Sequence, residues 1–130
     1  MFNPAQLADF VTAARDNGIP VITKVGELNR TEITRLLDAG IMGIQLPRTE
    51  SAADVAQLVD YVKYPPIGSR PGAPCFGHVA YRVIENHGLW LATANQATLV
   101  IAHIETAKGF ENADEIISSP HLDMLFIGIY

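Results

Sequence analysis

Glu105 and His103 are the residues of this chain whose types and spacing are best suited to chemistry. They lie two positions apart at the end of the apolar run Leu99–Ile104, and residues two apart in an extended strand point to the same face. A carboxylate at the end of a buried strand requires a cation, a metal ion or a proton as its partner. Glu105 is therefore a candidate metal ligand or catalytic group. The alternative is that Glu105 opens the next helix, where the helix dipole stabilises it.

Two cationic side chains are further candidates. Arg70 lies in a stretch rich in Gly and Pro, residues 67–72, and its guanidinium could hold a carboxylate or a developing enolate oxygen. The alternative is a solvated loop arginine. Lys24 follows a short β-branched run and could form a Schiff base, although a lysine at a strand end is more often a salt-bridge partner.

The other titratable side chains carry weaker signals. His78, His87 and His121 lie in expected loops or near helix ends and show no metal-ligand spacing. His103 is a ligand, a neighbour of a substrate or an interior histidine with satisfied hydrogen bonds, and the last is the default. Cys75 has no adjacent base to make it a nucleophile. As the single cysteine it forms no internal disulfide, so we expect a reducing, cytoplasmic compartment.

The composition excludes several classes of protein. Hydrophobic residues make up 48% of the 130 residues, which is enough apolar surface to offset the chain entropy of folding, so intrinsic disorder is excluded. The longest apolar runs are far shorter than the roughly 20 residues that a membrane-spanning helix needs. The net charge is −5 and no basic block is present, so neither a membrane nor a nucleic acid is an expected partner. No secretory signal is visible at the N-terminus.

Short apolar runs that alternate with amphipathic segments must position these residues. Strands are expected to begin near residues 20, 41, 66, 99 and 124, the third being very short and running into a long loop. Helices are expected between them, over about residues 3–17, 29–39, 51–63 and 112–117, and in two pieces between 80 and 95 with a break near Gly88. This alternation predicts an α/β fold in one domain, residues 1–130, with a parallel sheet.

Two architectures fit this order of elements. One is a small doubly wound sheet, and the other is part of a (β/α)₈ barrel. No Gly-rich phosphate loop follows the first strand, which disfavours the first. In both, ligands gather at the carboxyl ends of the strands. There we expect six side chains, followed by Gly128 at the end of the last strand: Lys24, Gln45, Arg48, Arg70, His103 and Glu105.

Five segments of the chain carry a resemblance to a known family. They are LLDAGIMGI (residues 36–44), YPPIGSR (64–70), LATAN (91–95), VIAHIET (100–106) and FIG (126–128). In order and spacing they resemble the HpcH/HpaI aldolase family, and the second and fourth segments together are fairly specific.

The resemblance implies a fold and a reaction. The fold is a (β/α)₈ TIM barrel, of which the chain would hold five of the eight strands, approximately strands 2 to 6. The reaction is that of a carbon–carbon lyase acting on pyruvate, a 2-oxo acid, and an aldehyde, with Mg²⁺, Mn²⁺ or Co²⁺ stabilising the pyruvate enolate. The resemblance makes Glu105 a metal ligand and Arg70 the catalytic, enolate-binding arginine, with His103 and Gly128 at the substrate. The full-length protein is expected to be a homo-oligomer.

The sequence departs from the family at several positions. The family usually has Gln where His103 stands, and residues 71–76 differ from its usual loop. Its second metal ligand, an Asp, would lie beyond Tyr130, and its proton-transfer His and Asp would lie before Met1. We therefore expect this chain alone to be a poor catalyst whose open strand edges invite association or aggregation. The alternatives are a citrate-lyase-β-like acyl-CoA lyase, which the acidic charge disfavours, and a non-catalytic binding or assembly module.

Overall fold

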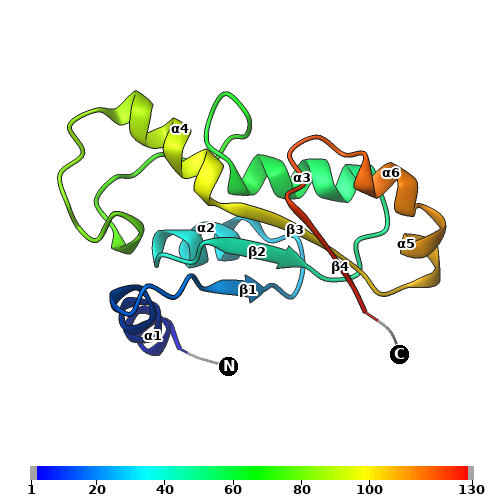
Figure 1. The fold of residues 1–130 in the computed structure, drawn as a ribbon, viewed down its shortest axis with the longest axis horizontal. Coiled ribbons are helices and arrows are strands. Elements are labelled where there is room, and N and C mark those ends of the chain that lie inside the picture. The colour runs from blue at the N-terminus through cyan, green and yellow to red at the C-terminus, as the bar shows by residue number, and fades with distance from the viewer. Residues whose placement is uncertain (1–2, 129–130) are drawn as a thin grey trace.

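Helices and parallel strands alternate along the chain in the computed structural model, which describes residues 3–128 (Figure 1). The elements in chain order are α1 (Pro4–Asp16), β1 (Ile22–Lys24), α2 (Arg30–Asp38), β2 (Gly43–Leu46), α3 (Ala52–Val62), the 3₁₀ turn η1 (Gly77–Val79), α4 (His87–Ala97), β3 (Leu99–Ile104), α5 (Ala107–Glu111), α6 (Ala113–Ile117) and β4 (Met124–Ile127). No helix in this part of the chain is long and apolar enough to cross a membrane.

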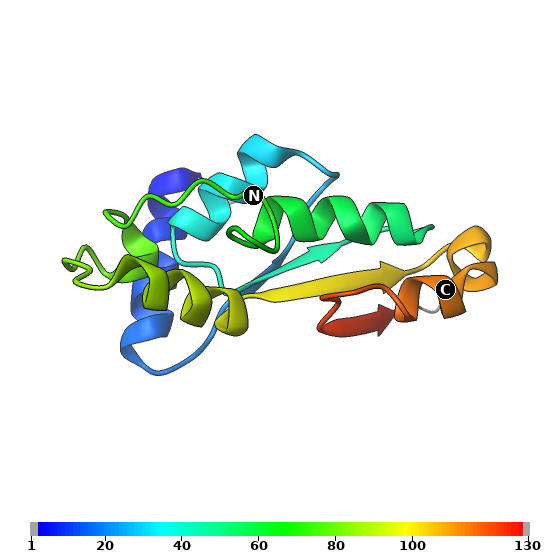
Figure 2. The ribbon, with the colours of Figure 1, turned by 90° about the horizontal axis from the view of Figure 1, so that it is seen from above.

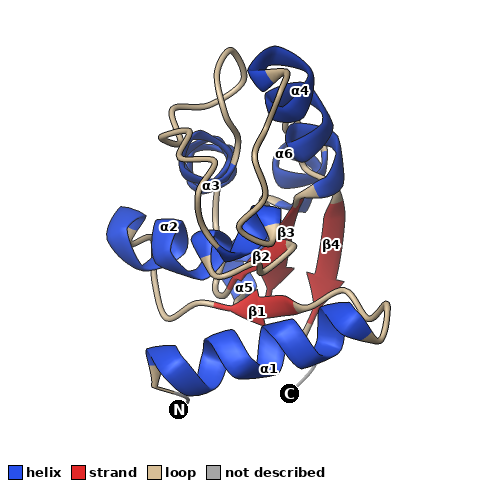
Figure 3. Ribbon diagram, turned by 90° about the vertical axis from the view of Figure 1, so that its left-hand side faces the viewer, coloured by secondary structure: helices blue, strands red, loops and turns tan. Residues whose placement is uncertain are grey.

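The four strands form one parallel sheet in the order β1-β2-β3-β4. Lys24 lies beside Gln45, Gln45 beside Ile101, and His103 beside Phe126. Figures 2 and 3 show α2 and α3 stacked on one face of this sheet. The strand order never reverses, whereas a doubly wound sheet needs a reversal point. The architecture is therefore a segment of a (β/α)₈ barrel, as the sequence predicts.

The expected strand near residue 67 is absent, so the described residues contain four strands and not five. β2 pairs directly with β3, which leaves no position for a strand between them. Residues 65–68 form a turn, in which the Gly68 N–H donates to the Tyr64 carbonyl at 3.2 Å. A Cβ on Gly68 would stand 2.5 Å from the Lys63 carbonyl oxygen. The backbone of this turn is therefore packed against the end of α3 and cannot extend.

Local capping explains most helix starts. The Asn3 side chain accepts the N–H of Gln6, and the Gln6 side chain accepts the N–H of Asn3, so α1 begins with a reciprocal cap. The expectation of two helical pieces over residues 80–95 is wrong. Asn86 accepts the N–H of Leu89 at 3.0 Å and starts α4, so Gly88 lies inside the first turn of that helix.

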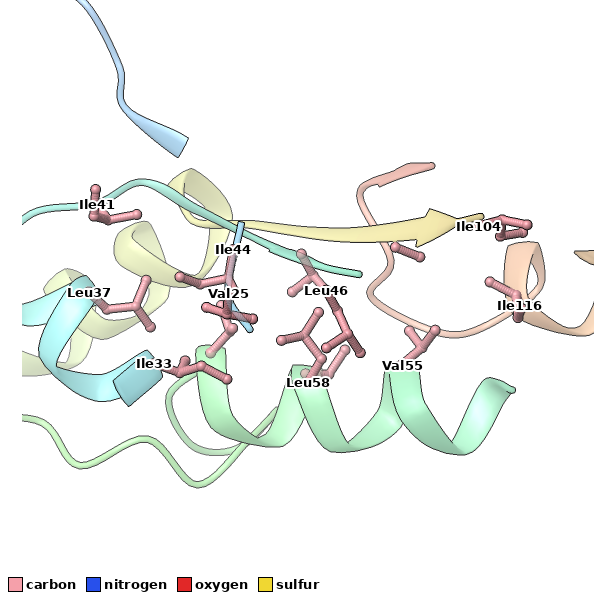
Figure 4. Close-up of a cluster of buried hydrophobic side chains, with 14 of the residues drawn as sticks. Val25, Ile33, Leu37, Ile41, Ile44, Leu46, Val55, Leu58, Ile104 and Ile116 are labelled. Atoms are coloured by element: carbon pink, nitrogen blue, oxygen red, sulfur yellow. The ribbon is translucent and has the colours of Figure 1, made fainter. Parts of the chain in front are cut away.

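The hydrophobic core lies between the sheet and helices α2, α3 and α6 (Figure 4). Ile44 on β2, Ile33 on α2 and Val55 on α3 are fully buried in it. Because side chains alternate along a strand, the residues next to Ile44 in β2, and those that pair with them in the other strands, point to the opposite face of the sheet. We call that face, made by Ile22, Lys24, Gln45, Ile101, His103, Met124 and Phe126, the inner face. In a closed barrel it lines the interior.

Candidate functional site

The Glu105 carboxylate is the centre of a cluster at the carboxyl ends of β1, β2 and β3. The Lys24 ammonium, at the end of β1, lies 3.4 Å from Glu105 Oε2. The backbone N–H of Arg48, just after β2, donates to Oε1 at 3.1 Å. The Glu105 side chain itself is only 7% exposed. Three segments far apart in the sequence thus converge on one nearly buried carboxylate.

These neighbours keep Glu105 ionised. Burial by itself raises the pKa of a carboxyl group, but the His103 imidazole, the Arg48 hydrogen bond and the Lys24 charge together outweigh it, so the pKa of Glu105 lies below its ordinary value. Lys24 is thus the cationic partner that a carboxylate at a strand end requires. The expectation that Lys24 is a salt-bridge partner is confirmed.

His103 is buried on the inner face beside Glu105. Its Nε2 atom lies 3.5 Å from Glu105 Oε2, and its ring meets the Phe126 ring edge-on, with centroids 4.8 Å apart. Within residues 3–128, neither ring nitrogen has a hydrogen-bond partner. The default interpretation of His103, an interior histidine whose ring nitrogens both have hydrogen-bond partners, is therefore wrong. Its nitrogens have unused hydrogen-bonding capacity next to a carboxylate.

Gly128 follows β4 and lies directly against this pair. Its N–H donates to the Ile104 carbonyl at 2.9 Å, which holds the end of β4 to β3. A Cβ on Gly128 would stand 2.6 Å from His103 Nε2 and 3.1 Å from Glu105 Cβ. The backbone approaches the two side chains as closely as only a glycine permits. The structure therefore brings together three of the four predicted site residues, Glu105, His103 and Gly128.

Arg70, the fourth predicted site residue, lies at the end of the sheet opposite to Glu105. Its Nη2 donates at 2.9 Å to Oδ1 of Asp38, the last residue of α2. Arg70 also lines a cavity of about 490 Å³ together with Val21 and Met42, which directly precede β1 and β2. The expectation that Arg70 joins Glu105 at the carboxyl ends of the strands is therefore wrong. The reason is that α3 runs back towards the amino ends, and the following turn leaves Arg70 there.

Arg70 is held in place by buried neighbours at that amino-terminal end. It is only 3% exposed, and its guanidinium lies over the Tyr64 ring, 4.5 Å from the centroid. Burial raises the pKa of Tyr64; the Arg70 charge opposes this rise, and the Asp38 charge adds to it. Burial and the Arg70 charge lower the pKa of the nearby His78. These contacts give Arg70 a structural role in joining the turn after α3 to α2.

Sequence reasoning did not identify the backbone amide of Arg48. Arg48 adopts a left-handed conformation, with φ of 49°, directly after Pro47, the residue that follows β2. A hydrogen bond from a backbone N–H does not depend on the type of side chain, so the sequence does not reveal it. The nearest local signal of this backbone conformation is Pro47. Cys75, the single cysteine, is free and exposed and is not part of the Glu105 cluster.

Residues 5–129 match the family described as HpcH/HpaI aldolase/citrate lyase. The chain belongs to this family. It is 32% identical over 119 residues to a 2-dehydro-3,6-dideoxy-6-sulfogluconate aldolase of Pseudomonas putida, a match that covers 89% of this chain and 44% of the relative. It is 29% identical to a hydroxypyruvate/pyruvate aldolase of Chromohalobacter salexigens, over 96% of this chain and 48% of that protein.

A solved structure of the same family confirms the architecture. The HpcH/HpaI aldolase of Desulfitobacterium hafniense superimposes with a TM-score of 0.91 at 26% identity, over 98% of this chain and 49% of that one. The chain thus spans about half the length of the family members that it matches. Its four strands keep the arrangement that they have in an intact barrel of the family.

Membership of this family implies a divalent metal ion. Such an ion prefers anionic oxygen ligands. Glu105 fits that requirement, because it is nearly buried at the carboxyl ends of the strands and its pKa is lowered. Among residues 3–128, no group of three or more His, Cys, Asp or Glu side chains is placed to hold an ion. The described part of the chain therefore offers one carboxylate that could bind such an ion, Glu105, with His103 beside it.

Proposed function

We propose that this chain forms the enolate-binding half of a metal-dependent aldolase, a lyase that makes or breaks a carbon–carbon bond next to pyruvate. The observation that carries the proposal is the ionised Glu105 carboxylate at the carboxyl ends of the strands, surrounded by Lys24, His103 and Gly128. The aldolase names of the P. putida and C. salexigens relatives support the reaction type.

Glu105 is proposed to be one ligand of a divalent cation such as Mg²⁺, Mn²⁺ or Co²⁺. When bound, the ion would act as a Lewis acid on the keto oxygen of a 2-oxo acid and stabilise the enolate. The protein contribution at Glu105 is to keep the carboxylate ionised and oriented. The Arg48 N–H fixes one oxygen at 3.1 Å, and the second oxygen faces Lys24 and His103.

Lys24 is proposed to bind the substrate carboxylate, one of the two roles that the residue type of Arg70 suggested; the resemblance itself assigned Arg70 to the enolate oxygen. Its side chain is 46% exposed while its ammonium reaches Glu105, so it contacts both the buried carboxylate and the solvent from which substrate arrives. An ammonium attracts the carboxylate of a 2-oxo acid without the planar fork of arginine. Arg70 cannot serve here, because its guanidinium is bound to Asp38 at the other end of the sheet.

His103 and Gly128 are proposed to shape the substrate position. The unpartnered His103 nitrogens can hydrogen-bond a substrate oxygen. Gly128 adds no side-chain atom next to Nε2, where a Cβ would stand only 2.6 Å away. Phe126 packs against the imidazole and fixes its ring plane, which orients the nitrogens before substrate arrives.

Exchange of the pyruvate methyl protons in D₂O, followed by ¹H NMR, tests this proposal because it reports enolate formation without an aldehyde. The chain is placed in a closed barrel by replacing the matching segment of the P. putida aldolase with residues 5–129. We expect EDTA-sensitive exchange. Glu105→Gln should lower its rate at least 100-fold, and Lys24→Ala should chiefly raise the KM for pyruvate.

Glu50→Gln is the matched control, because Glu50 is also a carboxylate paired with one lysine, Lys108, at 3.4 Å, but lies outside the cluster. It should leave the exchange rate unchanged. EDTA-sensitive exchange that survives Glu105→Gln would contradict the ligand assignment. EDTA-resistant exchange, with borohydride trapping pyruvate on Lys24, would replace the metal mechanism by a Schiff base.

A further inference from the structure

The segment that follows β2 stays attached to β3. β2 ends at Leu46, and the next residue, Pro47, has no N–H with which to continue the sheet. The Thr49 N–H donates to the His103 carbonyl at 3.0 Å, and the His103 N–H donates to the Thr49 hydroxyl at 3.3 Å. Thr49, which lies outside the strand, therefore binds both backbone polar groups of His103.

The hydroxyl of Thr49 joins the two strands directly. It accepts from the His103 N–H on β3 and donates to the Leu46 carbonyl on β2 at 3.0 Å. Thr49 is fully buried, so water does not replace these contacts freely. A valine has the same shape, but it would remove this partner from a buried N–H and a buried carbonyl, which is costly. Position 49 therefore requires a hydroxyl and not only the volume of a threonine.

The Thr49 contacts also fix the peptide that binds Glu105. Arg48 has a φ of 49°, a conformation that a residue with a side chain keeps only where its surroundings enforce it. Pro47 restricts the backbone before it, and Thr49, bound to His103, holds the backbone after it. In this conformation the Arg48 N–H donates to Glu105 Oε1 at 3.1 Å. Since Glu105 is two residues from His103, the same contacts set the distance between the Arg48 amide and the carboxylate.

Helix α5 packs against the same segment. Gly109 is buried in α5, and a Cβ on it would stand 2.5 Å from the Thr49 carbonyl oxygen. Asn112, just after α5, donates from its side chain to the Glu50 carbonyl at 2.8 Å. Residues 49 and 50 are therefore held between β3 and the helix that follows it.

We propose that Thr49 is a positioning residue for Glu105. It acts through the His103 backbone and the Arg48 N–H, and it holds the Glu105 carboxylate in the orientation that a metal ligand needs. Groups that orient a metal ligand typically contribute about 10–100-fold to metal affinity or activity. The expected effect on the reaction rate rests on the proposed function, whereas the geometry is measured without any activity.

Hydrogen exchange of the Arg48 amide tests this geometry. [¹⁵N]arginine labelling of the closed barrel that contains residues 5–129 gives a small set of amide signals, and Arg48→Lys identifies the signal of residue 48. Thr49→Val should raise the exchange rate of the Arg48 amide at least about tenfold, because its hydrogen bond to Glu105 is loosened. Thr49→Ser keeps the hydroxyl and should leave that rate within about twofold of the wild-type rate.

Pyruvate methyl exchange measures the consequence for the reaction. Thr49→Val should lower kcat about tenfold and leave KM nearly unchanged, because Lys24 keeps its place, and Thr49→Ser should restore kcat. Thr98→Val is the matched control. The Thr98 hydroxyl also donates to a backbone carbonyl, that of Ala94 at 2.8 Å, but it lies at the other end of β3. This variant should change neither the Arg48 amide exchange nor kcat.

Gly109→Ala is a second variant, which removes no hydrogen-bonding group. Its new Cβ must displace the Thr49 carbonyl, so we expect faster exchange of the Arg48 amide here as well. Arg48 exchange that is unchanged in both Thr49→Val and Gly109→Ala would overturn the proposal. An equal rise in Thr49→Val and Thr49→Ser, or in Thr49→Val and Thr98→Val, would also overturn it, because the hydroxyl at position 49 would then have no specific effect.

The two proposals fail in different ways. A wild-type barrel without pyruvate exchange, in which the Arg48 amide still responds to Thr49→Val and not to Thr98→Val, would contradict the aldolase proposal and support the positioning role of Thr49. EDTA-sensitive pyruvate exchange that is unaffected by Thr49→Val, with unchanged Arg48 exchange, would support the aldolase proposal and overturn the role of Thr49.

Discussion

The Arg70 guanidinium donates a 2.9 Å hydrogen bond to the Asp38 carboxylate and ties the turn after α3 to the end of α2. Their side chains are 3% and 22% exposed, so the pair is largely shielded from water. This contact lies at the amino ends of the strands, whereas the Glu105 cluster lies at the carboxyl ends. The stabilising contact and the proposed chemistry therefore lie at opposite ends of the sheet, the usual division in (β/α)₈ barrels.

Replacing Arg70 by Met should lower the free energy of unfolding by about 3 kcal/mol, because removal of one partner leaves Asp38 uncompensated in a shielded site. Urea unfolding followed by circular dichroism measures this change. Lys108→Met is the control, because the Lys108–Glu50 pair is exposed on the lysine side, and its loss should cost less than about 1 kcal/mol. Equal losses of unfolding free energy in the two variants would contradict the structural role of Arg70.

The pH dependence of stability should report Glu105. Its pKa in the folded state lies below the ordinary value of 4.5, so the unfolded chain binds this proton more readily. The stability from this group is complete above pH 4.5 and is lost as the pH falls below 4.5 through the lowered pKa. In urea titrations from pH 6 to pH 3, Glu105→Gln should remove this part of the acid dependence. Parallel wild-type and Glu105→Gln curves would show that Glu105 does not contribute.

Gly128→Ala should destabilise the end of β4, because the new Cβ would stand 2.6 Å from His103 Nε2. Either the imidazole or the strand must shift, at a cost of about 1–3 kcal/mol. A double-mutant cycle with His103→Ala isolates the clash, since shortening His103 should restore most of the stability lost in Gly128→Ala. Additive effects in this cycle would show that the two residues are not in contact.

His78 should produce a second pH effect, near neutrality. Its pKa in the folded state is lowered from 6.5 by burial and by the Arg70 charge, so the folded chain favours the neutral imidazole. The stability from this preference is complete above pH 6.5 and is lost as the pH falls below that value, through the lowered pKa. His78→Gln should flatten the stability profile between pH 7.5 and pH 5.5. An unchanged slope in that variant would contradict the assignment.

The local features of the fold follow from residues close together in the sequence. Asn29 accepts the N–H of Glu32 at 3.0 Å, and Ser51 accepts the N–H of Asp54 at 3.2 Å, as their spacing predicts. A cap joins residues three apart, so the tertiary structure is not needed to recognise it. The same holds for β3, where alternation alone predicts that His103 and Glu105 share a face.

By itself, the sequence determined the α/β class, the helix caps, the longest strand and the carboxylate at its end, because each depends on periodicity or on neighbours within a turn. Only the tertiary structure decided which distant residues meet. Lys24 and Glu105 are 81 positions apart, and Arg70 departs from the site because a turn packed on α3 keeps it at the amino ends. Such contacts depend on the direction in which each connection returns to the sheet, and no local pattern of residue types specifies that direction.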